Sequence, residues 1–204
     1  MLIIIIGQSK AEVTMNNILH ENTIMQYFDT LNSYSHIELG DFISELIPED
    51  LISNYTPIIL CIGTDRATGD CLGPLVGDQL VNYDSRIKVM GCLETPVHAL
   101  NIRETISEIN MKVENPFIIA VDAALGQGCH VGHITVSNTP IFPGKGVNKK
   151  LPAIGDISIT GIVNVSSHHS GLLHSTRLYT VVTLANCIAD ALKHSIDYFD
   201  VLPL

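Results

Sequence analysis

Short apolar runs alternate with amphipathic stretches along most of the chain. Two segments, Pro57–Gly63 and Pro116–Val121, are apolar almost without interruption, which is typical of strands covered on both faces of a sheet. Around them the apolar residues follow the helical period, and we expect helices over Pro74–Val81 and Ile102–Met111 and a further strand over Ile87–Cys92. Strands and helices that alternate in this way predict an α/β fold with a largely parallel sheet.

The first third of the chain is less regular. Leu2–Ile6 has the composition of a buried strand or an apolar leader, and the spaced apolar residues of 10–31 predict an amphipathic helix. Asp41 is an expected N-cap for a short helix, Phe42–Leu46, which Pro48 would end.

The pattern of expected strands and helices changes after the Pro116–Val121 strand. We expect strands over His133–Ser137 and Ile157–Val165, separated by a long loop, Thr139–Gly155, rich in glycine, proline and lysine. A final helix is expected over Leu173–Ile196, apolar enough to cover the sheet and equally suited to a homodimer interface. No segment has the composition of a linker, so the sequence predicts one domain over residues 1–204.

Composition and charge narrow the class of protein. Hydrophobic residues make up 46% and charged residues 16% of the chain, which indicates a folded globular protein rather than a disordered one. The formal net charge of −10 argues against nucleic-acid binding, which needs a basic face, and suits a basic polypeptide partner. Leu2–Ile6 is too short to span a membrane and lacks the flanks of a signal peptide. The five cysteines include no C-x-x-C pair, so we expect free thiols and a cytoplasmic protein.

Two aspartates are the best candidates for a functional site. Asp70 lies in a glycine-rich loop between the Pro57–Gly63 strand and the next helix, and Asp122 directly follows the Pro116–Val121 strand. In open α/β sheets, ligands bind beyond the carboxyl ends of the strands. If the two strands are neighbours, the two carboxylates converge. The loop also supplies further candidates for shaping the site or binding substrate: Gly63, Thr64, Asp65, Arg66, Gly69 and Gly73.

Several chemistries remain open for this pair of aspartates. Two close carboxylates cannot both ionise easily, so one can act as an acid while the other activates a water molecule. A metal ion bridging them would use the same oxygens differently. In a purely structural alternative, Asp70 caps the helix that begins near Leu72 and Asp122 accepts hydrogen bonds from loop amides.

Glycine motifs for phosphate and dinucleotide binding are incomplete in this chain. Gly63-x5-Gly69 carries Asp70 where a phosphate loop needs lysine. Gly126-x-Gly128-x3-Gly132 precedes an expected strand, so no helix N-terminus is available for a pyrophosphate. We therefore expect no cofactor.

The histidines raise the question of a metal site. On a strand His130 and His133 would point to opposite faces, and there is no second cysteine pair beside Cys129, so we expect no structural zinc site. His168 and His169 follow the Ile157–Val165 strand and could reach the aspartates. They equally suit a polar turn in which Ser166 or Ser167 caps the last helix.

The strongest motifs resemble a known family. Gly63-Thr-Asp-Arg-x-Thr-Gly-Asp-x-Leu-Gly-Pro74, Ala120-Val-Asp-Ala123 and Pro143-Gly-Lys-Gly-Val147 are similar to the YyaC family of sporulation proteins. That family resembles the spore germination protease, an aspartic-type endopeptidase that degrades small acid-soluble spore proteins. The resemblance implies catalytic roles for Asp70 and Asp122, a substrate-orienting role for Lys145, and a place in the forespore or spore interior.

Both families also resemble the hydrogenase maturation proteases, which implies a three-layer α/β/α sandwich with a mixed, largely parallel sheet. Those proteases use two acids and a histidine to sense nickel in their substrate. This chain has no histidine between Pro140 and Gly161, so His168 or His169 would have to substitute.

The leading hypothesis is a sporulation-associated, endopeptidase-like hydrolase that acts on a protein or peptide substrate through Asp70 and Asp122. One alternative is a non-catalytic sporulation protein that keeps the fold for binding. The other is a metal-dependent maturation protease.

Overall fold

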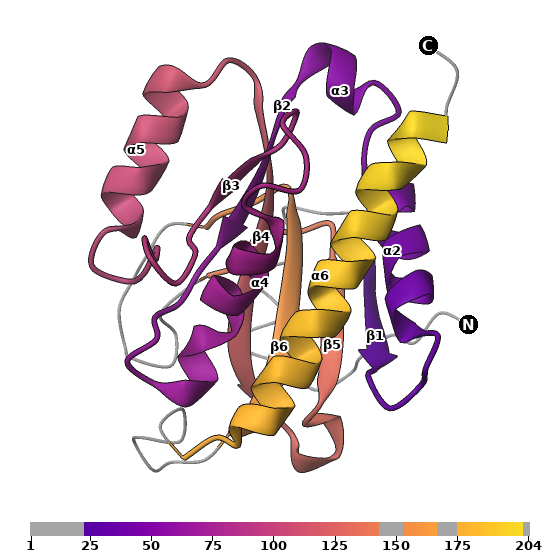
Figure 1. The fold of residues 1–204 in the computed structure, drawn as a ribbon, viewed down its shortest axis with the longest axis vertical. Coiled ribbons are helices and arrows are strands. Elements are labelled where there is room, and N and C mark those ends of the chain that lie inside the picture. Colours follow the sequence, from indigo (N-terminus) through magenta and orange to yellow (C-terminus); the bar gives the residue numbers. More distant parts are fainter. Residues whose placement is uncertain (1–22, 143–152, 167–174, 202–204) are drawn as a thin grey trace.

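The computed structural model describes residues 23–142, 153–166 and 175–201 (Figure 1). Six strands form one mixed sheet in the order β1-β5-β6-β4-β2-β3. The strands are β1 (Met25–Asp29), β2 (Thr56–Cys61), β3 (Lys88–Met90), β4 (Pro116–Gly126), β5 (His133–Ser137) and β6 (Ile157–Val165). The helices are α2 (Ser35–Leu46), α3 (Leu51–Asn54), α4 (Leu72–Leu80), α5 (Ile102–Lys112) and α6 (Leu178–Val201), with short 3₁₀ turns η1 (Thr68–Cys71) and η2 (Gly128–His130).

The parallel part of the sheet is built from the two apolar segments that the sequence singles out. β2 pairs in parallel with β3 on one side and with β4 on the other, and β4 pairs in parallel with β6. β5 runs antiparallel to both β6 and β1. The predicted mixed, largely parallel sheet is therefore confirmed.

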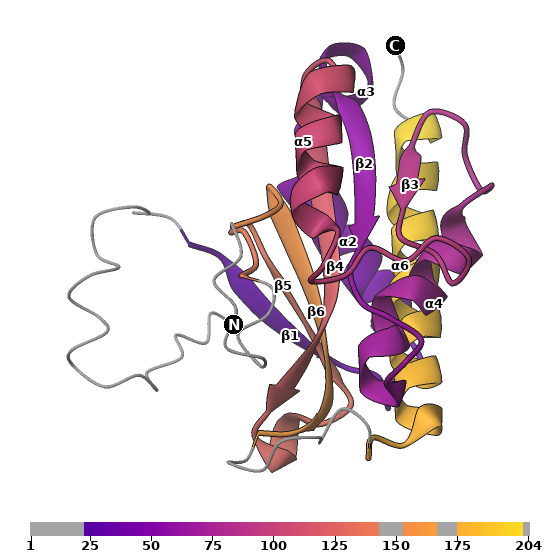
Figure 2. The ribbon, with the colours of Figure 1, turned by 90° about the vertical axis from the view of Figure 1, so that its left-hand side faces the viewer.

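Helices cover both faces of this sheet, as Figure 2 shows from the side. The larger core lies between the sheet and helices α2, α4 and α6. The smaller core lies on the opposite face, where Ile102 of α5 packs with Leu60, Ile62 and Ala120 of the central strands. The predicted three-layer α/β/α sandwich is confirmed by this arrangement.

Helix α6 covers the sheet through one apolar face. Val181, Leu184, Ile188 and Leu192 recur at helical spacing and are fully buried. The sequence predicts this helix over Leu173–Ile196, but it begins at Leu178, after a turn and a bend at residues 175–176, and continues to Val201; residues 173 and 174 lie outside the described residues. None of the described helices combines the length and the apolar character needed to cross a membrane.

The N-terminal third departs from the sequence prediction. The helix expected over 10–31 is wrong where the structure describes it, because Met25–Asp29 is an edge strand whose Tyr27 pairs with Thr135 of β5. Residues 1–22, which include the expected Leu2–Ile6 strand, lie outside the described residues. The apolar spacing there matched a helix by chance, and the cross-strand pairing that decides the matter is not visible locally.

Asp41 is not an N-cap. Helix α2 begins six residues earlier, at Ser35, whose hydroxyl donates a hydrogen bond to the Asp29 carbonyl. Asp41 lies in the middle of the helix, where its Oδ1 is 2.8 Å from His194 Nε2 on α6. The expected end of this helix before Pro48 is confirmed.

Strand lengths also differ from the prediction, in opposite directions. β3 is limited to Lys88–Met90, whereas β4 continues past Val121 to Gly126 because β6 keeps pairing with it through a register shift at Ala124/Leu125. Asp122 therefore lies inside a strand rather than at its end.

Candidate functional site

The loop that follows β2 folds back on itself at Gly63. This glycine has φ of +145°, and a Cβ there would lie 1.9 Å from the Asp70 carbonyl oxygen. The Thr64 N–H donates to that same carbonyl at 3.0 Å. A Cβ on Gly73 would lie 2.2 Å from the Ile62 carbonyl oxygen, so the start of α4 also approaches β2 more closely than a side chain allows. These two glycines hold η1, and with it Asp70, against the end of β2.

Asp122 comes to the same place from the neighbouring strand. The β2–β4 ladder ends where Cys61 pairs with Val121, so Asp122 is the first β4 residue beyond the end of β2. Its Oδ1 accepts a hydrogen bond from the Ala123 N–H at 2.8 Å. Asp122 thus lies just beyond the end of β2, where the negative charge of Asp70 acts on its carboxyl group.

The electrostatics of Asp122 reflect this position. Loss of solvent raises the pKa of the Asp122 carboxyl to about 8, the negative charge of Asp70 adds to the rise, and the Ala123 N–H opposes it. The Asp122 carboxyl group therefore keeps its proton to a higher pH than an ordinary aspartate does. A protonated acid next to a second carboxyl group is the arrangement that general acid–base chemistry needs.

The structural alternatives receive partial support. The N-cap position of α4 is Cys71, not Asp70. Asp122 does accept a backbone hydrogen bond, although the donor is the next residue of its own strand rather than a loop amide.

The other predicted site residues differ in how exposed they are and in whether the structure describes them. Thr64 is half-buried and its hydroxyl oxygen lies 3.4 Å from the Arg66 amide nitrogen, whereas the side chains of Asp65 and Arg66 are exposed. Gly69 is buried directly before Asp70 in η1. Lys145, His168 and His169 lie outside the described residues, so the structure does not place them.

Two neighbours of the site carry no signal in the sequence. Thr160 of β6 is the register partner of Asp122, so both side chains lie on one face of the sheet. Cys71 is next to Asp70, and its thiol donates to the Thr68 carbonyl at 2.9 Å. Burial raises the pKa of this thiol, and the charges of Asp70 and Asp65 add to the rise, so Cys71 is a neutral thiol rather than a nucleophile. Thr160 could have been found only from the strand register.

The histidine prediction for the β5 region is wrong in its geometry. His130 lies in η2 rather than on a strand, and its ring centroid is 5.6 Å from that of His133 and 4.9 Å from that of Tyr27. The buried Nδ1 of His133 has no hydrogen-bond partner in the structure. Within the three described ranges, no group of three or more histidine, cysteine, aspartate or glutamate side chains is arranged to hold a metal ion.

Comparison with known proteins places the chain among relatives of similar sequence. The profile of a family described as "Protein of unknown function (DUF1256)" matches residues 24–191. The "Uncharacterized protein YyaC" of Bacillus subtilis (strain 168) is 47% identical over 138 residues, which is 67% of this chain and 67% of that protein. Among solved structures, the [NiFe] hydrogenase maturation protease HycI from Thermococcus kodakarensis KOD1 aligns with 71% of this chain and 97% of its own, at 20% identity and a TM-score of 0.39.

Proposed function

This chain belongs to the DUF1256 family together with YyaC of Bacillus subtilis, and we propose that it is an endopeptidase-like hydrolase. The observation that supports the proposal is the position of Asp122 just beyond the end of β2, where burial and the charge of Asp70 raise the pKa of its carboxyl group to about 8. Peptide hydrolysis requires one group that accepts a proton from water and another that donates one to the substrate.

The environments of the two aspartates assign these roles. The Asp70 carboxylate accepts a proton from a water molecule, whose oxygen attacks the carbonyl carbon of the peptide bond. Protonated Asp122 donates its proton to the carbonyl oxygen, which becomes the hydroxyl of a tetrahedral intermediate. When the intermediate collapses, the C–N bond breaks and the leaving nitrogen takes the proton held by Asp70, while the hydroxyl proton returns to Asp122.

The substrate class follows from charge and from the family resemblance. A net charge of −10 favours a basic polypeptide through long-range attraction. The resemblance to the spore germination protease points to small spore proteins as the first substrates to test, and to the interior of the forespore as the place of action.

The test uses the full chain and four variants. We expect Asp70→Asn and Asp122→Asn each to reduce kcat/KM on purified small acid-soluble spore proteins by about 10³-fold or more, because each removes one half of the acid–base pair. Asp190→Asn is the control, since Asp190 is an exposed aspartate on α6 that is not among the predicted site residues. Thr160→Val tests the neighbour of Asp122 by the same assay. Thermal unfolding shows whether each variant is folded.

Cleavage by folded Asp122→Asn at the wild-type rate would refute the proposal. Absence of cleavage by the wild type, together with tight binding of the same spore proteins, would identify a binding protein on this fold instead. Elemental analysis of the purified protein and the effect of a chelator on the cleavage rate test the metal-dependent alternative separately.

A further inference from the structure

Strand β3 is the last strand at one edge of the sheet that the described residues form. Within the described part of the chain, β3 pairs only with β2, through Ile58–Leu60 against Lys88–Met90. The outward backbone N–H and C=O groups of an edge strand are a ready template for another extended segment. The edge is short, three residues long.

This edge borders two cavities that form one groove. A cavity of about 630 Å³ lies between β3, the preceding turn and α5, and a cavity of about 490 Å³ lies at the carboxyl end of β3. Both are lined by Val89 and Met90, so they are neighbours along the strand. Half of the residues that line the first cavity are apolar: Val81, Ile87, Val89, Met90, Ile109 and Val113. We call this feature the β3 groove.

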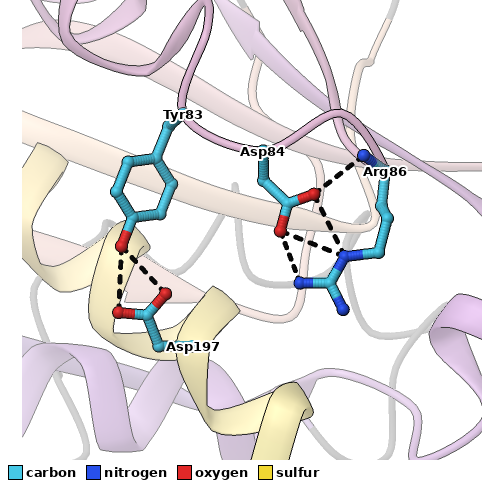
Figure 3. Close-up of polar contacts among 4 residues, drawn as sticks. All are labelled: Tyr83, Asp84, Arg86 and Asp197. Carbon is cyan, nitrogen blue, oxygen red and sulfur yellow. Dashed lines mark hydrogen bonds and ion pairs between the residues drawn. The ribbon is translucent and has the colours of Figure 1, made fainter.

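The two acids that line the first cavity, Asp84 and Glu108, each form an ion pair with a neighbouring base, and Lys88 lines the same cavity. Arg86 Nε donates to both carboxylate oxygens of Asp84, and this contact holds the pKa of Asp84 below its usual value (Figure 3). On α5, Lys112 Nζ lies 3.1 Å from Glu108 Oε1. Tyr83 donates to Asp197 of α6 and fixes the turn that forms one wall, as Figure 3 also shows. The rim acids are thus neutralised locally, and the lining suits apolar side chains.

The inner end of the groove reaches the candidate site. Val97 lines the second cavity and pairs with Ile62, and its carbonyl accepts a hydrogen bond from the Gly63 N–H at 2.8 Å. Val97 also shares the smaller core with Ala120. Because alternate residues of a strand share a face, Asp122 lies on the same face of β4 as Ala120. The second cavity therefore borders the Gly63 loop through Val97.

We propose that the β3 groove binds an extended, mainly apolar segment of the protein substrate, which adds to β3 as a further strand. The edge of β3 suits a partner with an extended backbone, and the apolar residues of the lining suit apolar side chains. Because the second cavity borders the Gly63 loop through Val97, the bound segment lies next to the loop that carries Asp70. The inference therefore rests on the proposed function and specifies how the substrate binds.

Binding can be measured apart from cleavage. The probe is a fluorescein-labelled octapeptide of alternating valine and threonine with a lysine at each end, titrated by anisotropy against the full chain carrying Asp122→Asn. Glu108→Trp, added to that background, places an indole at the groove wall, and Asn110→Trp places one on an exposed position of α5 that does not line the groove. An N-methylated form of the probe keeps the side chains but loses backbone donors.

We expect Glu108→Trp and N-methylation each to weaken binding by about tenfold or more, whereas Asn110→Trp leaves it unchanged. Equal binding of the probe by Glu108→Trp and Asn110→Trp would overturn the proposal, as would equal binding of the N-methylated peptide. If the wild-type chain does not bind the peptide but forms a dimer that Glu108→Trp disrupts, a second copy occupies the groove. That result also overturns the proposal. Matching thermal unfolding of the two tryptophan variants shows that the fold is intact.

The groove and the catalytic pair can fail independently. If the Asp122→Asn chain cleaves spore proteins at the wild-type rate while peptide binding still responds to Glu108→Trp, the catalytic proposal fails and the groove stands. If a chain with only Glu108→Trp cleaves the spore proteins with unchanged KM, the groove fails and the catalytic proposal stands.

Discussion

Asp84 and Asp122 show how strongly neighbouring groups influence the ionisation of a carboxyl group. The pKa of Asp84 is lowered because Arg86 donates hydrogen bonds to it, whereas the pKa of Asp122 is raised because burial and the charge of Asp70 both oppose ionisation. Asp84 therefore stays ionised to a lower pH than an ordinary aspartate, and Asp122 keeps its proton to a higher pH. That difference makes Asp122 a proton donor in the proposed reaction.

The raised pKa of Asp122 also predicts a pH-dependent stability. The folded chain holds a proton on Asp122 up to pH of about 8, whereas the unfolded chain releases it near the ordinary value of 3.8. The folded state therefore binds more protons between these values, and the contribution of Asp122 to stability falls as pH rises through that window. Relative to the wild type, Asp122→Asn should gain roughly 2–4 kcal/mol between pH 5 and pH 9, a range discounted for relaxation around the charge.

Denaturant unfolding of both proteins at several pH values measures this difference. Asp156→Asn is the control, because Asp156 is exposed and, like Asp122, accepts a backbone hydrogen bond, here from Ile118 at 2.8 Å. A constant stability difference between wild type and Asp122→Asn across this pH range would show that Asp122 is not held protonated.

At the scale of elements, the turn between β2 and α4 is what fixes the candidate site. Gly63 and Gly73 approach backbone carbonyls that cannot move without displacing η1 or β2. Gly161 of β6 is a different case, since a Cβ there would first meet the Leu72 Cδ2 methyl at 2.5 Å, which is the end of a side chain. A Cβ that meets a backbone carbonyl cannot be accommodated by a local movement, whereas a side-chain methyl group that it meets can rotate aside.

Alanine at Gly63 and alanine at Gly161 should therefore destabilise the fold by different amounts. We expect Gly63→Ala to destabilise the fold by about 2–4 kcal/mol, because it adds both a clash with Asp70 and a strained φ. Gly161→Ala, the matched control, should cost about 1 kcal/mol. Urea unfolding measures both free energies, and equal losses would show that the turn at Gly63 is not sterically fixed.

The elements differ in how far the sequence could predict them. The two apolar strands and the glycine loop carry local signals, so the sheet core and the position of Asp70 follow from the residues themselves. β1 could not be predicted, because its pairing with β5 joins residues more than a hundred positions apart. The extension of β4 past Asp122 and the neighbouring Thr160 depend on register with β6 in the same way. The β3 groove depends on how α5 packs beside an edge strand, which no local pattern encodes.

At the scale of the whole molecule, a three-layer fold carries an acidic surface. Helices α2, α4 and α6 cover one face of the sheet and α5 covers part of the other, while the candidate site opens where β2 ends (Figure 2). The apolar β3 groove and the net charge of −10 act at different ranges. The groove selects side chains in contact, and the charge attracts basic chains before contact.

Salt should therefore separate these two contributions to substrate recognition. Exposed charges are screened over about 8–10 Å near physiological ionic strength, whereas apolar contacts are not weakened by salt. We expect kcat/KM for a basic unfolded protein to fall about three- to tenfold between about 20 and 200 mM NaCl, with the change mainly in KM. A neutral apolar peptide, cleaved by the same preparation, should show no such fall. An equal response of both substrates would show that the acidic charge does not contribute to selectivity, and recognition would then reside in contacts such as those of the β3 groove.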